Sequence, residues 1–289
     1  MTTLAKTHWL VLATIAVVLV SCGSSSGTRP SLPDYLNGGI VVYGDSRTGH
    51  SVHREVVERV KSIQPKAVFH TGDIVTNGSN QYNWDNFHNI TGELLASTVF
   101  YPAGGNHEEP NHSGTLYFEQ FTLPGNERWY SVDANGIRFI VLDTVSSIAN
   151  NTTQYQWLES QLQSVSADST VAVVFHYPPY STGQHNADEK GLRQSIVPLF
   201  ETHDVDLVLT GHDHNYERSE VNGVTYLVTG GGGASLRNQD AAKVGSYDSS
   251  VLYVKAHHFC VIYQDAGKVM VDVWSKDVEL IDQFEVPVP

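Results

Sequence analysis

The sequence predicts an α/β fold built on a mixed β-sheet or on two packed sheets. Short apolar, β-branched runs alternate with segments of helical periodicity through most of the chain. Hairpin signals at Asn135-Gly136 and Asn222-Gly223 interrupt this alternation. From Val221 onward the chain is rich in strands, with a further turn at Ala266-Gly267. We therefore expect both parallel strands joined by helices and antiparallel hairpins.

The elements of the N-terminal half follow from the spacing of apolar residues. We expect strands at 40–43, 67–70 and 98–101 and helices at 51–64 and 84–96. The first helix carries Val52, Val56 and Val60 on one face and stops at Pro65. The second helix is expected to break or kink near Gly92.

The C-terminal half mixes hairpins with helices. We expect a hairpin at 129–132 and 137–142, helices at 154–163 and 190–202, and strands at 170–175 and 205–210. The helix at 190–202 is expected to continue through Pro198. The strands of the C-terminal region then complete the sheet or sheets.

The N-terminus predicts export and a lipid anchor. Lys6 precedes an apolar run at 9–20, which is shorter than the roughly 20 residues of a membrane-spanning helix. Residues 1–21 therefore read as a signal peptide. Residues 19–22 resemble the bacterial lipobox, which implies a diacylated Cys22 and a membrane-anchored lipoprotein of the cell envelope. The alternative is a plain secretory signal with an incidental cysteine.

We expect residues 22–37 to form a flexible tether, because they are rich in glycine, serine and proline. Residues 38–289 then form a single domain. Without Cys22 this domain keeps only Cys260, so it has no internal disulfide.

Composition and charge limit the class of partner. The chain has 289 residues, of which 40% are hydrophobic and 17% charged, as in an ordinary globular protein. Its formal net charge of −14 argues against nucleic acid or an anionic membrane as a partner. An acidic protein that binds a phosphate compound needs a local cationic site, which metal ions would supply.

Residues of the types that commonly bind metals follow five of the apolar runs. They are Asp45, Asp73, Asn106-His107, His176, and the pair His212 and His214. In open α/β sheets, binding sites form beyond the carboxyl ends of the strands. His212 and His214 are two residues apart, so both can face one point. The set is sufficient for two metal ions, and its nitrogen and oxygen ligands suit Fe, Zn, Mn or Co.

These blocks resemble the five motifs of the calcineurin-like metallophosphoesterases. The blocks are Gly44-Asp45, Gly72-Asp73, Gly104-Gly105-Asn106-His107-Glu108, Val174-Phe175-His176 and Gly211-His212-Asp213-His214. The Asn106-His107-Glu108 block, the continuation Asn215-Tyr216-Glu217-Arg218 and the glycines 230–233 are most similar to the purple acid phosphatase branch. The resemblance spans about 38–263 and implies a two-sheet β-sandwich flanked by helices, with four layers in the order α/β/β/α.

The resemblance also implies a ligand set and a reaction. Asp73 would bridge two metals, Asp45 and His214 would hold the first, and Asn106, His176 and His212 the second. A metal-bound hydroxide would attack the phosphorus of a small-molecule phosphate ester in line, most simply a monoester. His107 would protonate the leaving oxygen.

Two positions depart from the family pattern. Thr76 stands where the phosphatase branch has a tyrosine, and Arg47 where the wider superfamily has a histidine. The first metal therefore lacks a fourth protein ligand, unless His50, His53 or water takes that place. Without the tyrosine we expect no purple colour. The planar guanidinium of Arg47 has the right shape to bind two phosphate oxygens. The alternative is that Arg47 lies at the surface or caps a helix.

Other residues and functions are also compatible with the sequence. His185 falls where the phosphatase branch places histidines that contact substrate, although a solvated loop histidine is the alternative. His112 and Tyr177 are candidates for the mouth of the site. One alternative function is that of a phosphodiesterase or nucleotidase. Another is that of a degenerate, non-catalytic envelope protein that binds phosphate or metal.

Overall fold

The computed structural model describes residues 30–108, 115–166, 168–185, 188–245 and 250–287. The predicted signal peptide, Cys22 and His112 lie outside the described residues. Within them, no helix is both long and apolar enough to cross a membrane. Residues 31–289 form one compact unit. Leu36, in the 3-10 helix Asp34–Leu36, is buried, so packing begins slightly before residue 38, where we expected the domain to start.

The first of two sheets has six strands in the order β13-β12-β11-β1-β2-β3. Its strands are β1 (Ile40–Tyr43), β2 (Ala67–His70), β3 (Val99–Pro102), β11 (His258–Asp265), β12 (Lys268–Ser275) and β13 (Leu280–Val286). The first three strands are parallel, and β11 pairs with β1 in the antiparallel direction. The sheet is therefore mixed.

The second sheet has seven strands in the order β10-β8-β9-β7-β6-β5-β4. Its strands are β4 (Tyr130–Ala134), β5 (Ile137–Val141), β6 (Thr170–Val174), β7 (Leu207–Thr210), β8 (Tyr216–Val221), β9 (Val224–Thr229) and β10 (Ser250–Val254). β5, β6, β7 and β9 are parallel, whereas β4, β8 and β10 pair in the antiparallel direction. Asn135 and Gly136 both have positive φ, 53° and 79°, which confirms the predicted hairpin turn.

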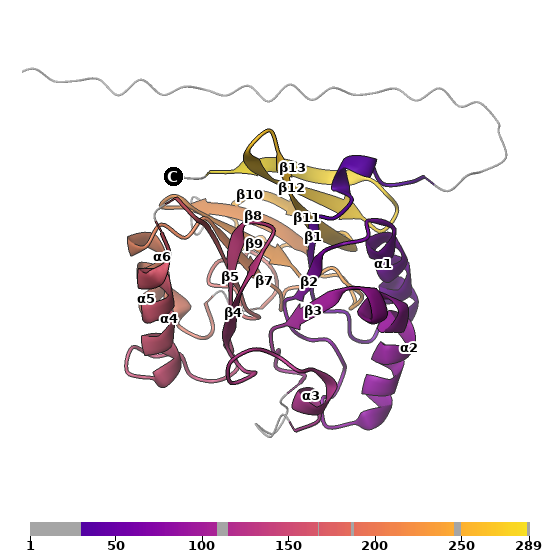
Figure 1. The fold of residues 1–289 in the computed structure, drawn as a ribbon, viewed down its shortest axis with the longest axis horizontal. Coiled ribbons are helices and arrows are strands. Elements are labelled where there is room, and N and C mark those ends of the chain that lie inside the picture. The colour runs from indigo at the N-terminus through magenta and orange to yellow at the C-terminus, as the bar shows by residue number, and fades with distance from the viewer. Residues whose placement is uncertain (1–29, 109–114, 167, 186–187, 246–249, 288–289) are drawn as a thin grey trace, which may run out of the picture. The chain divides into compact units, whose positions relative to one another are not determined.

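Helices cover the outer faces of the two sheets (Figure 1). α1 (His50–Ser62) and α2 (Gln81–Ser97) lie beside the first sheet, and α4 (Thr153–Ser164), α5 (Leu192–Ser195) and α6 (Val197–Thr202) beside the second. Between the sheets, Phe69 of β2 stacks on Phe139 of β5 with 4.1 Å between ring centroids. The four-layer α/β/β/α arrangement implied by the resemblance is confirmed.

Alternate residues of the central strands face the two sides of the sheet. In β6, Ala172 and Val174 belong to the core between the sheets, whereas Val171 and Val173 pack under the helices α4 to α6. Burial on both faces explains why this strand is a continuous apolar run in the sequence.

Three helical details differ from the sequence prediction. The helix expected at 190–202 is two helices, with Ile196 between them and Pro198 in the first turn of the second. Proline has no N–H to bond within a helix, but this costs nothing in a first turn. α2 runs unbroken through Gly92, so the expected break is wrong. The short helix α3 (Thr115–Gln120) was not predicted.

Candidate metal centre

The candidate ligands lie at the carboxyl ends of β1, β2, β3, β6 and β7, where the two sheets meet. Asp45, Asp73 and His212 each follow a glycine and have left-handed backbone conformations, with φ of 54°, 56° and 70°. Such conformations are uncommon for residues other than glycine and concentrate at functional sites. The turn they make directs each side chain across the end of its sheet.

Asp45, Asp73 and His214 form the first group, with ligand atoms within 4.8 Å of one another. His214 Nε2 lies 3.5 Å from Asp45 Oδ1. His214 Nδ1 lies 2.8 Å from the carbonyl oxygen of Ser235, which can only accept, so we assign the ring proton to Nδ1. Nε2 then keeps a lone pair that faces the carboxylates, as a metal ligand requires.

Asp45 supports a cation at this position independently of any family resemblance. Its side chain is fully buried, and Oδ2 accepts a hydrogen bond from the His212 N–H at 2.9 Å. Oδ1 has no hydrogen-bond partner among the described residues. A buried carboxylate oxygen without a donor is costly unless a cation neutralises it. The residues present therefore fit a metal ion.

His176, Asn106 and His212 converge on a second point. His176 Nε2 lies 3.0 Å from Asn106 Oδ1, 3.2 Å from His212 Nδ1 and 3.4 Å from Asp73 Oδ1. His176 Nδ1 lies 2.9 Å from the carbonyl oxygen of Thr71, so we assign its proton to Nδ1 as well. The structure thus brings together the three residues proposed for the second metal, with Asp73 between the two groups.

Glu189 was not singled out from the sequence. Its Oε1 lies 3.1 Å from His212 Nε2, an ion-pair distance without hydrogen-bond alignment. His185, Glu189 and His212 also form a group whose ligand atoms lie within 4.8 Å of one another. Because His212 Nδ1 faces His176, we assign the ring proton to Nε2, on the side where Glu189 lies. We therefore interpret Glu189 as a carboxylate that stabilises this form of His212 through its charge. Its only sequence signal was its closeness to His185.

The environment keeps His212 neutral and Asp73 charged. Burial, followed by the neighbouring histidines, lowers the pKa of His212 far below its usual value. Burial alone would raise the pKa of Asp73, but two histidines and Arg47 outweigh it and lower that pKa. A neutral imidazole and an ionised carboxylate are the forms that bind metals.

Arg47 and His107 both contact Asp73. Arg47 Nε donates a hydrogen bond to Asp73 Oδ2 at 3.0 Å, and the arginine side chain is 15% exposed. His107 donates its backbone N–H to Asp73 Oδ1 at 3.1 Å. Its Nδ1 lies 2.6 Å from the Thr76 carbonyl oxygen, so the proton is on Nδ1 and Nε2 faces Asp73 Oδ2 at 3.7 Å.

Glu108 holds the loop that carries Asp73. Its buried carboxylate accepts hydrogen bonds from the N–H groups of Asp73 and Gly105, both at 2.8 Å, and of Val75 at 3.1 Å. Burial and then the charge of Asp73 raise the pKa of Glu108 to about 8. The sequence placed Glu108 in a motif, but its role as a loop clamp was visible only in the structure.

His185 lies at the edge of the second group. Its ring packs on His212 with 3.8 Å between centroids, and its N–H donates to Asp213 Oδ1 at 3.1 Å. His50 and His53, the candidates for the fourth ligand of the first metal, lie apart from both groups. His53 is buried, with Nε2 3.3 Å from the Tyr43 hydroxyl, and neither it nor His50 belongs to the two groups.

The glycines at 230–233 pass directly beneath the ligand loops. A Cβ on Gly230 would lie 2.2 Å from the Asp213 carbonyl oxygen, and one on Gly232 would lie 2.5 Å from that of Gly44. Any larger residue would displace the loops that carry Asp45 and His214.

Residues 39–216 match the family of calcineurin-like phosphoesterases. Among curated relatives, probable inactive purple acid phosphatase 1 of Arabidopsis thaliana is 31% identical over 240 residues, covering 67% of this chain and 38% of the relative. A purple acid phosphatase of Glycine max is 31% identical over 175 residues, covering 55% of this chain and 38% of the relative. The chain thus spans about two fifths of the length of these relatives.

Solved structures show the same fold. Purple acid phosphatase PPD1 from yellow lupin (Lupinus luteus) has a TM-score of 0.75 at 23% identity, covering 85% of this chain and 53% of that one. GAP50, the anchor in the inner membrane complex of Plasmodium, has a TM-score of 0.67 at 19% identity, covering 86% of this chain and 88% of that one. The chain therefore belongs to the calcineurin-like phosphoesterase family, with relatives among the purple acid phosphatases.

Proposed function

We propose that the protein is a dinuclear-metal phosphoesterase that hydrolyses phosphate monoesters of small molecules. This proposal rests on the position of Asp73, whose two carboxylate oxygens face different groups. Oδ1 lies 3.4 Å from His176 Nε2, while Oδ2 lies on the side of Arg47. When bound, two metal ions would supply Lewis acidity and a nucleophile near neutral pH.

His107 is the candidate general acid. The Thr76 carbonyl oxygen accepts its Nδ1–H, so the ring orientation is fixed and Nε2 faces the ligands. Protonated at Nε2, His107 can give that proton to the leaving alkoxide. Its side chain is 28% exposed, so it can exchange protons with solvent between turnovers.

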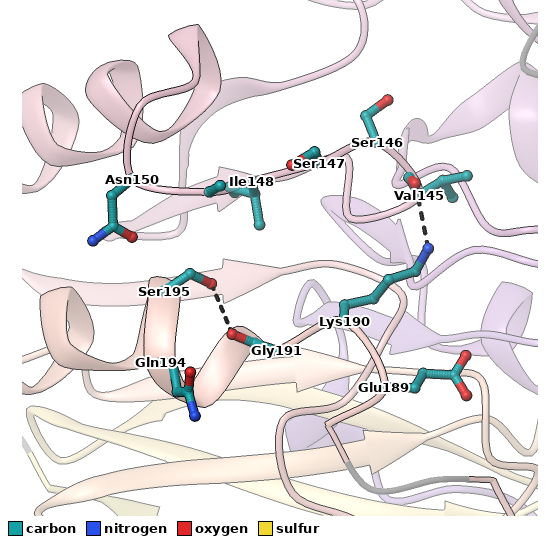
Figure 2. A pocket seen from close by; sticks show the side chains of 11 residues that line it. Val145, Ser146, Ser147, Ile148, Asn150, Glu189, Lys190, Gly191, Gln194 and Ser195 are labelled. Atoms are coloured by element: carbon teal, nitrogen blue, oxygen red, sulfur yellow. Dashed lines mark hydrogen bonds between the residues drawn. The ribbon is translucent and has the colours of Figure 1, made fainter.

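A cavity beside the metal centre supports a small polar alcohol as the leaving group. It has a volume of about 620 Å³ and is lined by residues 145–150, 189–191, 194 and 195. Glu189 belongs both to this lining and to the surroundings of His212. Figure 2 shows Lys190 reaching across to the Val145 carbonyl oxygen, 3.4 Å from its Nζ. Hydroxyl and amide side chains in the lining suit hydrogen bonds to a hydroxylated compound.

Asp73→Asn and His212→Ala test the proposed function. His212→Ala removes a ligand, and Asp73→Asn removes the charge and one of the two oxygens of the bridging residue. Each should therefore abolish metal-dependent hydrolysis of an aryl phosphate and lower the metal content. Full activity in both variants at unchanged metal content would refute the mechanism. Comparison of kcat/KM for mono- and diesters then separates a phosphatase from a phosphodiesterase.

A non-catalytic protein that binds metal or phosphate is the second candidate. It is favoured by Arg47, which occupies one side of the first group, and by relatives whose names describe them as probably inactive. Metal binding without hydrolysis of any phosphate ester would establish it.

We also propose that the protein is exported and anchored to the bacterial envelope through Cys22. This part of the proposal is supported by the lipobox-like sequence before Cys22. In a bacterial host, Cys22→Ser should release the protein from the membrane fraction. An unchanged distribution would contradict the anchor.

A further inference from the structure

Arg47 takes up the side of the first group on which a metal ion would bind. Its Nε lies 3.0 Å from Asp73 Oδ2, and its Nη2 lies 3.4 Å from His214 Nε2. The backbone of Arg47 is held in place as well, because its N–H donates to the Asp73 carbonyl oxygen at 3.3 Å. The guanidinium thus contacts a candidate ligand atom of each of the two residues.

These contacts use the lone pairs that a metal ion requires. A guanidinium has only donors, so the nitrogen of His214 that it contacts must accept. The ring proton of His214 on Nδ1, directed to Ser235, agrees with this assignment. Arginine also stays protonated at any ordinary pH. An imidazole nitrogen has a single lone pair, so a metal ion cannot bind His214 Nε2 while Arg47 keeps its position. At Asp73 Oδ2 the guanidinium competes through its charge rather than by using up the only lone pair.

The second site differs in this respect. Its ligand atoms face one another, with Asn106 Oδ1 and His212 Nδ1 lying 3.0 and 3.2 Å from His176 Nε2. Of the two sites, the first is the one at which a guanidinium contacts the candidate ligand atoms.

We propose that Arg47 is a built-in competitor for the first metal ion. The second site fills at low free metal. The first fills only at higher free metal, when the ion displaces the guanidinium from Asp73 and His214. The displaced side chain is then available to the phosphate group of a substrate. This inference rests on the metal centre of the proposed function, but not on hydrolysis.

Titration of the metal-free protein with Zn²⁺ tests the competition. Calorimetry and metal analysis after dialysis at fixed free Zn²⁺ should show two separate binding steps in the wild type. Arg47→Ala should move the weaker step to roughly 10- to 100-fold lower free Zn²⁺, because a charge-assisted hydrogen bond no longer has to be broken. The tighter step should shift less than the weaker one, because Arg47 bears on the second site through Asp73 and not through His176.

Three further variants assign the two steps. Arg54→Ala removes the same charge from an exposed position of α1 and should change neither step. His214→Ala should remove the weaker step, and His176→Ala the tighter one. Two steps of equal affinity in the wild type, or an unchanged weaker step in Arg47→Ala, would overturn the inference.

The result is separable from the proposed function. If the titrations behave as expected but no phosphate ester is hydrolysed, the competition stands and the enzymatic proposal fails. If Asp73→Asn abolishes hydrolysis but the wild type binds two ions equally, the enzymatic proposal stands and the competition fails.

Discussion

Glu189→Gln should weaken metal binding at the second site without removing a ligand. The substitution keeps the size of the side chain but removes the negative charge 3.1 Å from His212 Nε2. Loss of the carboxylate partner of a metal-binding histidine typically lowers metal affinity by about 10- to 100-fold. That corresponds to about 1.4 to 2.8 kcal/mol of binding free energy.

The assay is competition for Zn²⁺ between the protein and a chromophoric chelator. Glu119→Gln is the matched control, because it makes the same change at an exposed position of α3. An unchanged affinity in Glu189→Gln would refute the assignment of the His212 proton to Nε2. A complete loss of one bound ion would instead make Glu189 itself a ligand, with His185 and His212 as its partners.

Three further predictions concern stability and the cavity. Burial lowers the pKa of His53 to about 3, so the unfolded state binds a proton below about pH 6.5 that the folded state does not. Lowering the pH from 7.5 to 5 should therefore reduce the free energy of unfolding by about 2 kcal/mol through His53. In urea titrations His53→Gln should lose that part of the pH dependence, and an unaltered dependence would contradict it. Gly92→Ala should raise the free energy of unfolding by about 1 kcal/mol, because the new Cβ meets nothing within 4 Å; a decrease would contradict this. Lys190→Ala should raise KM for sugar phosphates more than for an aryl phosphate, whereas equal changes would exclude the cavity as the leaving-group pocket.

The fold and most of the proposed ligands could be predicted because the sequence patterns that indicate them lie within short, continuous segments. Each ligand follows a short apolar run, and the carboxyl ends of parallel strands come together at one edge of a sheet. Gly44-Asp45 and Gly72-Asp73 also carry the glycine and the left-handed aspartate that the turn requires. The sequence therefore indicated the edge of the sheets and the residues found there.

The remaining features depend on contacts between distant segments. Glu189 reaches His212 from a loop that has no periodic pattern of its own. α2 continues through Gly92 because Trp84, Phe87 and Leu94 are buried on its packed side, and that burial outweighs the low helix propensity of one glycine. Arg47 was expected to contact phosphate, and its bond to Asp73 became visible only once the two loops were placed side by side.

Removal and return of metal tests the central claim most directly. The purified protein should hydrolyse p-nitrophenyl phosphate, lose this activity after exhaustive chelation, and regain it when Zn²⁺, Mn²⁺, Co²⁺ or iron is added back. Metal analysis in the same samples should show that recovery follows the ions bound per chain. Hydrolysis that survives complete removal of metal, or protein that binds its metals and hydrolyses no phosphate ester, would contradict a metal-dependent phosphoesterase.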